Sequence, residues 1–174
     1  MNKLETNNRA DHVRSSGVLD SAHETKKRRG YFGIGIENTK TKMNIGTLWR
    51  SAYGLGAAFI FVIGNRYKSQ ASDTVKAMRH IPLYHFDTFE QFYENMPKDC
   101  LLVGVELHER SRKLEGYGHP ERAIYLLGAE DHGLSKTAIT KCHSIVEFDS
   151  KHCLNVAVAG SIVMYDRQCK TFNK

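Results

Sequence analysis

The chain has 174 residues, of which 41% are hydrophobic and 25% charged, and its formal net charge is +6. This length is typical of one domain with a complete hydrophobic core, and the composition excludes a disordered or fibrous protein. No apolar run approaches the roughly 18 to 20 residues that span a bilayer, and the polar N-terminus lacks the apolar core of a secretory signal, so we expect a cytoplasmic protein with no membrane partner.

The cysteines and histidines show no pattern of metal ligands. The four cysteines form no CxxC pair, which suits reduced thiols, and His132, His143 and His152 have no partner at HxxxH spacing. We therefore expect no metal. The positive charge favours a phosphate-rich partner such as RNA, although charge alone does not identify one.

The first 30 residues are expected to form a flexible basic arm. They are polar, carry the run KKRR at 26–29 and show almost no apolar periodicity, so they can contribute little to a core. A contact with RNA and a solvated leader are equally open interpretations of this arm. Residues 31–174 are expected to form a single domain.

From Tyr31 onward, short apolar segments alternate with helical patterns. Segments rich in Ile, Val, Leu and Phe predict strands at 32–37, 57–64, 83–86, 101–106, 123–128 and 144–148. Helices are expected at 45–56, 72–80, 88–96, 135–142 and 154–168. This alternation predicts an α/β fold with a mostly parallel sheet and helices on both faces.

The stretch LLGAEDHGLSK, at 126–136, is the first candidate site. Gly128 follows a buried strand and Gly133 precedes a helix, so both positions allow close backbone approach or a positive φ, while Ser135 can cap the helix. Ligands of parallel sheets bind where loops leave the carboxyl ends of strands. The stretch is neither a P-loop nor a GxGxxG motif, and an ordinary strand-to-helix turn is the alternative.

Two further stretches place polar residues beside apolar faces. In NIGTLWR, Asn44 is a suitable helix N-cap and Arg50 lies off the apolar face, where its guanidinium suits phosphate or carboxylate. In CLNVAVAG, Asn155 stands at the entrance of a helix or strand whose apolar residues indicate burial nearly all round, against the core and against a second subunit. A surface arginine and a capping amide are the structural alternatives.

Together the three stretches resemble the motifs of the TrmH/SpoU family. NIGTLWR is similar to N-x-G-x-x-x-R, LLGAEDHGLS to a strand-glycine-x-glutamate-x-x-glycine-leucine-serine motif, and CLNVAVAG to S-L-N-V-S-V-A, in the same order. The resemblance covers about 31–167. It implies a SPOUT-class RNA methyltransferase that acts on a ribose 2′-hydroxyl, uses S-adenosyl-L-methionine, ends in a trefoil knot and works as a homodimer.

The resemblance also implies a role for individual residues. The cofactor would contact Val105, Glu106, Gly128, Phe148 and Leu154. Asn44 and Arg50 would bind the RNA substrate, and Arg50 would face the acceptor ribose. The expected catalytic residues are Arg50, Asn155, which would organise the site, and Glu130, which would orient Arg50 or the motif backbone.

Two departures from the family pattern keep a second function open. Cys153 stands where the family has serine, and the loop 146–152 reads VEFDSKH where the family has an I-P-M-like segment. A thiol is a weaker hydrogen-bond partner than a hydroxyl, so the alternative is a catalytically weakened SPOUT protein that binds RNA.

A nucleotide-binding oxidoreductase is disfavoured by the missing GxGxxG. No appended recognition domain is visible, which favours tRNA over rRNA, but the sequence does not identify the methylated nucleotide.

Overall fold

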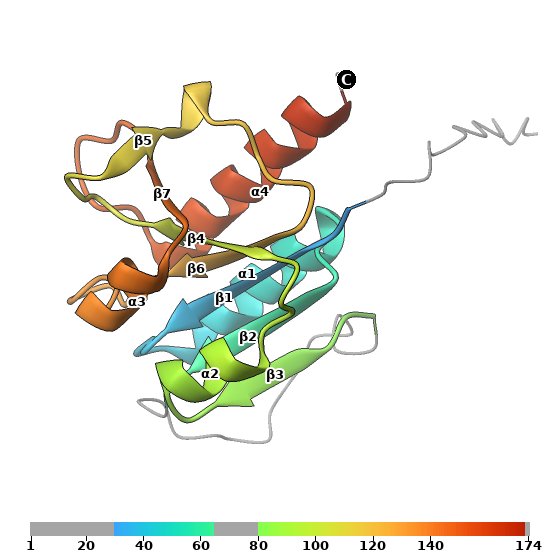
Figure 1. Ribbon diagram of the computed structural model, residues 1–174, viewed down its shortest axis with the longest axis vertical. Helices are drawn as coiled ribbons and strands as arrows, with labels where there is room; N and C mark the ends of the chain where they lie inside the picture. The colour runs from blue at the N-terminus through green and yellow to red at the C-terminus, as the bar shows by residue number, and fades with distance from the viewer. Residues whose placement is uncertain (1–29, 65–79, 173–174) are drawn as a thin grey trace, which may run out of the picture.

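The computed structural model of the protein describes residues 30–64 and 80–172. The basic arm expected over 1–30 lies outside this range except for Gly30, and the helix expected over 72–80 lies outside it except for His80. The remaining expected elements can be compared directly with the structure (Figure 1).

Seven strands form one sheet in the described part of the chain. They are β1 (Phe32–Glu37), β2 (Phe59–Ile63), β3 (Leu83–Phe86), β4 (Leu101–Val105), β5 (Ser111–Lys113), β6 (Ala123–Leu127) and β7 (Ser144–Glu147). Their order is β3-β2-β1-β6-β4-β7-β5, and all six ladders are parallel. The expected parallel α/β sheet is confirmed. Only β5 is additional, because its sequence SRK carries no apolar pattern.

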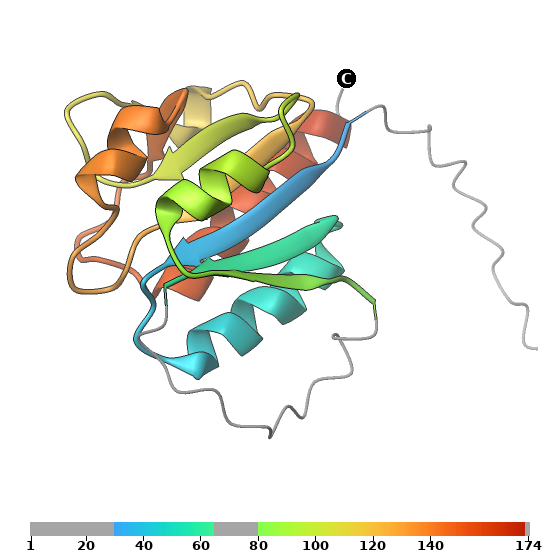
Figure 2. The ribbon, with the colours of Figure 1, turned by 60° about the horizontal axis from the view of Figure 1, so that its bottom comes forward.

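Helices cover both faces of the sheet, as expected (Figure 1 and Figure 2). Helices α1 (Lys42–Gly54) and α4 (Val156–Phe172) pack on one face, and α2 (Phe89–Asn95) and α3 (Lys136–Lys141) on the other, while a short 3-10 helix, η2 (Leu114–Gly116), follows β5. The central strands β1 and β6 are therefore buried at every residue, which explains their continuous apolar sequences.

The start of α1 differs from the sequence expectation. The helix begins at Lys42, after an N-cap at Thr41, so the interpretation of Asn44 as the N-cap is wrong. Asn44 is instead the third residue of the helix and is buried. Its amide is therefore available for tertiary hydrogen bonds rather than for its own helix end.

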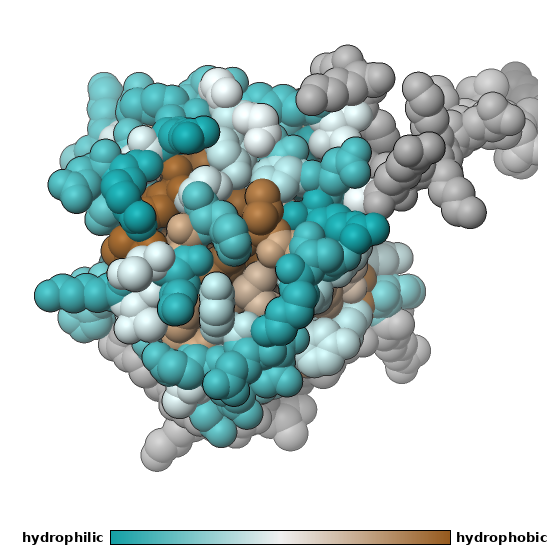
Figure 3. Space-filling model, in the orientation of Figure 1, coloured by the Kyte–Doolittle hydropathy of each residue, from teal (hydrophilic) through white to brown (hydrophobic). Residues whose placement is uncertain are grey.

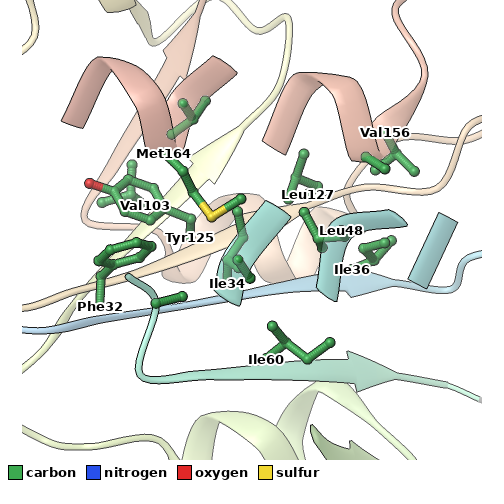
Figure 4. Close-up of a cluster of buried hydrophobic side chains, with 14 of the residues drawn as sticks. Phe32, Ile34, Ile36, Leu48, Ile60, Val103, Tyr125, Leu127, Val156 and Met164 are labelled. Carbon is green, nitrogen blue, oxygen red and sulfur yellow. The ribbon is translucent and has the colours of Figure 1, made fainter. Parts of the chain in front are cut away.

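Two hydrophobic clusters fill the space on either side of the sheet. In the first, Ile34 of β1 packs with Leu48 of α1 and Met164 of α4 (Figure 4). In the second, the rings of Phe61 and Phe92 stack with their centroids 4.4 Å apart. Burial of side chains of this size contributes roughly 1.5 to 3 kcal/mol each and fixes the helices on the sheet.

The two helices α1 and α4 approach each other closely through a small residue. A Cβ atom on Gly160 would lie 2.6 Å from Cδ1 of Leu48, so a larger residue would require the Leu48 side chain to shift. Beside it, the hydroxyl of Ser161 donates a hydrogen bond to Oγ of Ser51, at 2.9 Å. The contact sets the second turn of α4 beside the middle of α1.

The far end of α4 is fastened by Arg167, a buried charge that is only 4% exposed. Its guanidinium donates hydrogen bonds to the carbonyl oxygens of Pro120, at 2.5 Å, and Glu121, at 2.7 Å, and to the hydroxyl of Tyr125, at 3.2 Å. It also lies 5.0 Å from the centre of the Phe32 ring. These contacts compensate the cost of removing the charge from water.

The face in Figure 3 is hydrophilic around its rim, with a hydrophobic patch near its middle. None of the helices within residues 30–64 and 80–172 is long and apolar enough to cross a bilayer.

Replacing the buried guanidinium tests this description of α4. We expect Arg167→Leu to lower the free energy of unfolding by about 3 kcal/mol in urea titrations, because buried carbonyl groups lose their donors. The matched control is Arg122→Leu, since Arg122 makes an exposed ion pair with Asp99 that is worth at most about 1 kcal/mol. Equal losses for the two variants would contradict the assigned role of Arg167.

Candidate functional site

The carboxyl ends of β6, β4 and β7 lie side by side at one edge of the sheet. Val105, at the end of β4, is in register with Leu127 of β6 and with Val146 of β7. Gly128 directly follows β6, and Phe148 directly follows β7. The structure thus brings three of the residues expected to contact the cofactor to the same edge.

Two glutamates hold the loop that follows β6. Glu106 accepts a hydrogen bond from the backbone N–H of Leu134, at 2.8 Å. Glu37, which is 2% exposed, accepts one from the backbone N–H of Ser135, at 2.9 Å. Glu106, which was expected to contact the cofactor, therefore already has a structural role in shaping the loop.

Both glycines of this loop are required by its tight turn. A Cβ atom on Gly128 would lie 2.1 Å from the carbonyl carbon of Gly133. Gly133 has φ +65°, and a Cβ there would lie 2.4 Å from Oε2 of Glu106. The expected close approach at Gly128 and positive φ at Gly133 are confirmed, but the approaching groups belong to the protein itself. Ser135 caps α3 as expected, accepting a hydrogen bond from the N–H of Ala138 at 3.2 Å.

A row of hydrogen bonds joins the three candidate stretches. The side-chain amide of Asn155 donates to Oδ1 of Asn44, at 2.8 Å, and the amide of Asn44 donates to the Glu130 carboxylate. Thr39 also donates to that carboxylate, at 3.5 Å. Oδ1 of Asn155 accepts a hydrogen bond from the backbone N–H of Ala157, at 2.9 Å. Asn155 therefore caps α4 and links it to α1 at the same time.

Arg50 lies apart from this row. It is exposed on α1, six residues beyond Asn44, which corresponds to about 9 Å along the helix axis at about 1.5 Å per residue. Within the described residues, neither a hydrogen bond nor an ion pair is recorded for it. Glu130 therefore holds Asn44, and the structure shows no contact between Glu130 and Arg50.

Exposed apolar side chains flank the strand ends. Leu154, just before α4, is 42% exposed, and Leu107, just after β4, is 64% exposed. Phe148 is half-buried against the core. Such side chains beside polar backbone groups are typical of a site for a ligand with a flat apolar ring. Leu107 was not among the expected residues, although its position directly after an apolar strand could have indicated it.

A pocket adjoins the other side of the loop. It has a volume of about 410 Å³ and is lined by Asn38, Ala129, His132, Gly133, Leu134 and Ser135. Asn38 has φ +54°, an unusual value for a residue other than glycine. Val105, Phe148 and Leu154 do not line this pocket, which lies beyond the carboxyl ends of β1 and β6.

The thiols and histidines form no further centre in the described part of the chain. All four cysteines are free, and Cys153, two residues before Asn155, is exposed. No group of three His, Cys, Asp or Glu side chains that could hold a metal occurs within residues 30–64 and 80–172.

The loop geometry gives a test that is independent of any ligand. We expect Gly128→Ala to lower the free energy of unfolding by about 2 kcal/mol, because the new methyl group overlaps the backbone at Gly133. Gly116→Ala is the matched control, since a Cβ at that position meets nothing within 4 Å. Chemical denaturation of both variants measures the difference, and a Gly128→Ala protein as stable as the control would show that the turn is looser than described.

Comparisons with known proteins relate this arrangement to one family. A sequence model described as the SpoU rRNA methylase family matches residues 32–165. A curated relative from Archaeoglobus fulgidus, described as an uncharacterized tRNA/rRNA methyltransferase, is 26% identical over an alignment of 144 residues that covers 78% of this chain and 63% of the relative. The chain thus spans less than two thirds of that protein.

Two solved structures are similar in fold. One is the SpoU methyltransferase AviRb from Streptomyces viridochromogenes in complex with AdoMet, with a TM-score of 0.72 and 21% identity over 89% of this chain and 66% of that chain. The other, described as concerning 2-OH methylation of C/U34 on tRNA, has a TM-score of 0.72 and 18% identity over 83% of this chain and 99% of that chain. At these identities the similarity concerns the fold alone.

Proposed function

Because the chain belongs to the SpoU rRNA methylase family, whose sequence model matches residues 32–165, we propose that it is an RNA methyltransferase that uses S-adenosylmethionine. The observation that carries this proposal is the hydrogen-bonded row of Glu130, Asn44 and Asn155. It joins three separate sequence stretches beside the carboxyl ends of the strands. An arrangement that unites the family's motifs in one place is suited to a common site.

The surface at the strand ends fits the proposed cofactor. S-Adenosylmethionine, the ligand of the AviRb structure, supplies a methyl group from its sulfonium. The exposed side chain of Leu154 and the half-buried ring of Phe148 would pack against its adenine, beside Val105. Gly128 and Glu106 would contribute through the backbone, because the Glu106 carboxylate is engaged by the loop.

A ribose 2′-hydroxyl is the proposed acceptor, with tRNA favoured over rRNA. A similar structure concerns 2-OH methylation on tRNA, and the curated relative is described with both classes of RNA. The net charge of +6 supports attraction to the phosphate backbone of either RNA.

In this proposal, Arg50 anchors the RNA and stabilises charge rather than removing a proton. A guanidinium with a pKa above about 12 is almost never neutral in a protein, so it is a poor general base. Its planar set of donors instead suits the phosphate beside the target ribose and the charge that develops on the ribose oxygen. The proton would pass to a phosphate oxygen or to water. Asn44 and Asn155 would keep α1 and α4 aligned for this contact.

We also propose a homodimer formed through α4. The helix was expected to be buried nearly all round, but Val158, Ile162 and Tyr165 are 46%, 36% and 63% exposed. They lie four and three residues apart and so form one apolar stripe on the outer side of the helix. A second copy that packs against this stripe would remove it from water, in line with the expected contact between subunits.

The C-terminal segment of the domain is proposed to be knotted. Strand β7 pairs with β4 on the side away from β6, whereas α4 returns to pack against α1 and β6. The connection 148–155 must therefore pass back across the sheet edge, beside the loop that follows β6. We treat residues 31–174 as one methyltransferase domain, and the free thiols suit the reducing cytoplasm as its compartment.

Methyl transfer by variants at Arg50 tests the proposed function. We expect the unaltered protein to transfer labelled methyl groups from S-adenosylmethionine to the ribose of tRNA or rRNA. Arg50→Lys should lower turnover at least about 100-fold at every pH, because an ammonium cannot replace the planar donors. Arg112→Lys, at an exposed position on β5, is the control and should remain active.

Four other outcomes of that assay would change the interpretation. A fully active Arg50→Lys enzyme would exclude the anchoring role, and activity with a shifted pH profile would favour a titrating base. Methylation on a base instead of the ribose would overturn the proposed acceptor. RNA binding without any methyl transfer by the unaltered protein would establish the weakened, RNA-binding alternative.

The proposed dimer has its own test. We expect Ile162→Glu to convert the protein to a monomer in analytical ultracentrifugation, because the charge cannot be buried against a second copy of the stripe without a partner. Tyr84→Glu is the control, since Tyr84 is 50% exposed on β3 and lies outside the stripe. A monomeric unaltered protein, or a dimeric Ile162→Glu variant, would exclude this interface.

A further inference from the structure

An exposed aromatic pair at the end of α1 has no role in the proposed site. The rings of Tyr53 and His80 lie nearly parallel, with centroids 4.5 Å apart and planes inclined by 16°. Tyr53 is nevertheless 47% exposed, and His80 is also exposed. The pair therefore presents a flat aromatic surface to solvent.

A buried hydrogen bond between Trp49 and Ile81 fixes the position of this pair. Trp49 is only 4% exposed, and its indole N–H donates a hydrogen bond to the carbonyl oxygen of Ile81, at 3.1 Å. Ile81 is itself part of the core on this face of the sheet. The bond fixes the residue after His80 against α1, so the two rings are aligned before a ligand arrives. Alignment of this kind reduces the entropy that binding costs.

The pair lies close to Arg50, on the side of Arg50 that is farther from Asn44 along α1. Tyr53 follows Arg50 by three residues, so their Cβ atoms lie about 5 to 6 Å apart on the helix surface. Asn44 lies nine residues before Tyr53, or about 14 Å along the axis. A group stacked on Tyr53 would therefore belong to a neighbouring nucleotide and not to the one that is methylated.

The direction of Tyr53 separates it from the proposed subunit interface. Ser51 of α1 contacts α4 through Ser161, and Tyr53 lies about 160° around the helix from Ser51 at 3.6 residues per turn. The apolar stripe of Val158, Ile162 and Tyr165 is on α4. Tyr53 thus faces away from the helix that carries the stripe.

We infer that Tyr53 and His80 form a stacking site for an unpaired base of the RNA substrate, next to the nucleotide whose phosphate Arg50 contacts. This inference rests on the proposed function. Proteins that recognise single-stranded RNA stack its bases on exposed aromatic side chains, and they combine these with cations that hold the backbone. Arg50 and the aromatic pair provide both components on one face of one helix.

Binding of RNA to Tyr53→Ala tests the stacking site. We expect its affinity for unfractionated tRNA, or for rRNA if that is the RNA methylated, to fall about tenfold, as is typical when one stacking ring is removed. Tyr53→Phe should bind normally because it keeps the ring. Tyr84→Ala is the matched control, since that tyrosine is equally exposed but lies on β3 and contacts Phe59 edge to face.

Two accompanying measurements separate stacking from other effects. The slope of log Kd against log salt concentration should not change, because a neutral ring releases no counterions from RNA. Affinity for S-adenosylmethionine, measured by calorimetry, should also be unaffected. If Tyr53→Ala fails to fold, His80→Ala removes the other ring and leaves α1 intact, with a similar expected loss.

Each contrary result identifies what has failed. Unchanged RNA affinity of Tyr53→Ala, in a background that still transfers methyl groups, would overturn the stacking site alone. A loss of affinity that accompanies dissociation into monomers would show that Tyr53 belongs to a protein interface, which also overturns it. Absence of methyl transfer by the unaltered protein would instead overturn the proposed function.

Discussion

The hydrogen bond between Asn155 and Asn44 determines how the candidate site is assembled. It joins the first turn of α4 to the first turn of α1, although the two residues are separated by 111 positions in the chain. One turn further along α4, a Cβ atom at Gly160 would lie 2.6 Å from Cδ1 of Leu48, so a larger residue there would require the Leu48 side chain to shift. The polar row that ends at Glu130 therefore lies beside a close packing contact of the same two helices.

The loop after β6 owes its shape to charges that come from other strands. Glu37 is the last residue of β1, and Glu106 directly follows β4. Each accepts a hydrogen bond from a backbone amide of the loop. A loop held in this way by two carboxylates keeps its backbone close to the strand ends without help from a ligand. The surface that we propose for the cofactor is thus preformed by the protein.

The sequence predicted six of the seven strands of the described sheet but not the contacts that its loops and helices make with one another. Apolar segments such as that of β6 are buried on both faces, so their pattern identifies them directly, whereas SRK in β5 has no such pattern. The role of Gly128 could be predicted as a close approach, but not its partner, because sequence spacing does not reveal which backbone folds over it. Asn44 was misplaced as a helix cap, since α1 starts two residues earlier without a side-chain cap. Tyr53 and His80 could not be paired at all, because their contact joins a helix to a segment 27 positions away in the sequence.

The guanidinium of Arg167 has a consequence for how the protein is made. Its acceptors at Pro120, Glu121 and Tyr125 precede it by more than forty positions. During synthesis these acceptors leave the ribosome long before Arg167, and they remain hydrated until α4 packs against them. The nascent chain can therefore pair its strands early, but α4 can be fastened at its far end only after translation has passed position 167.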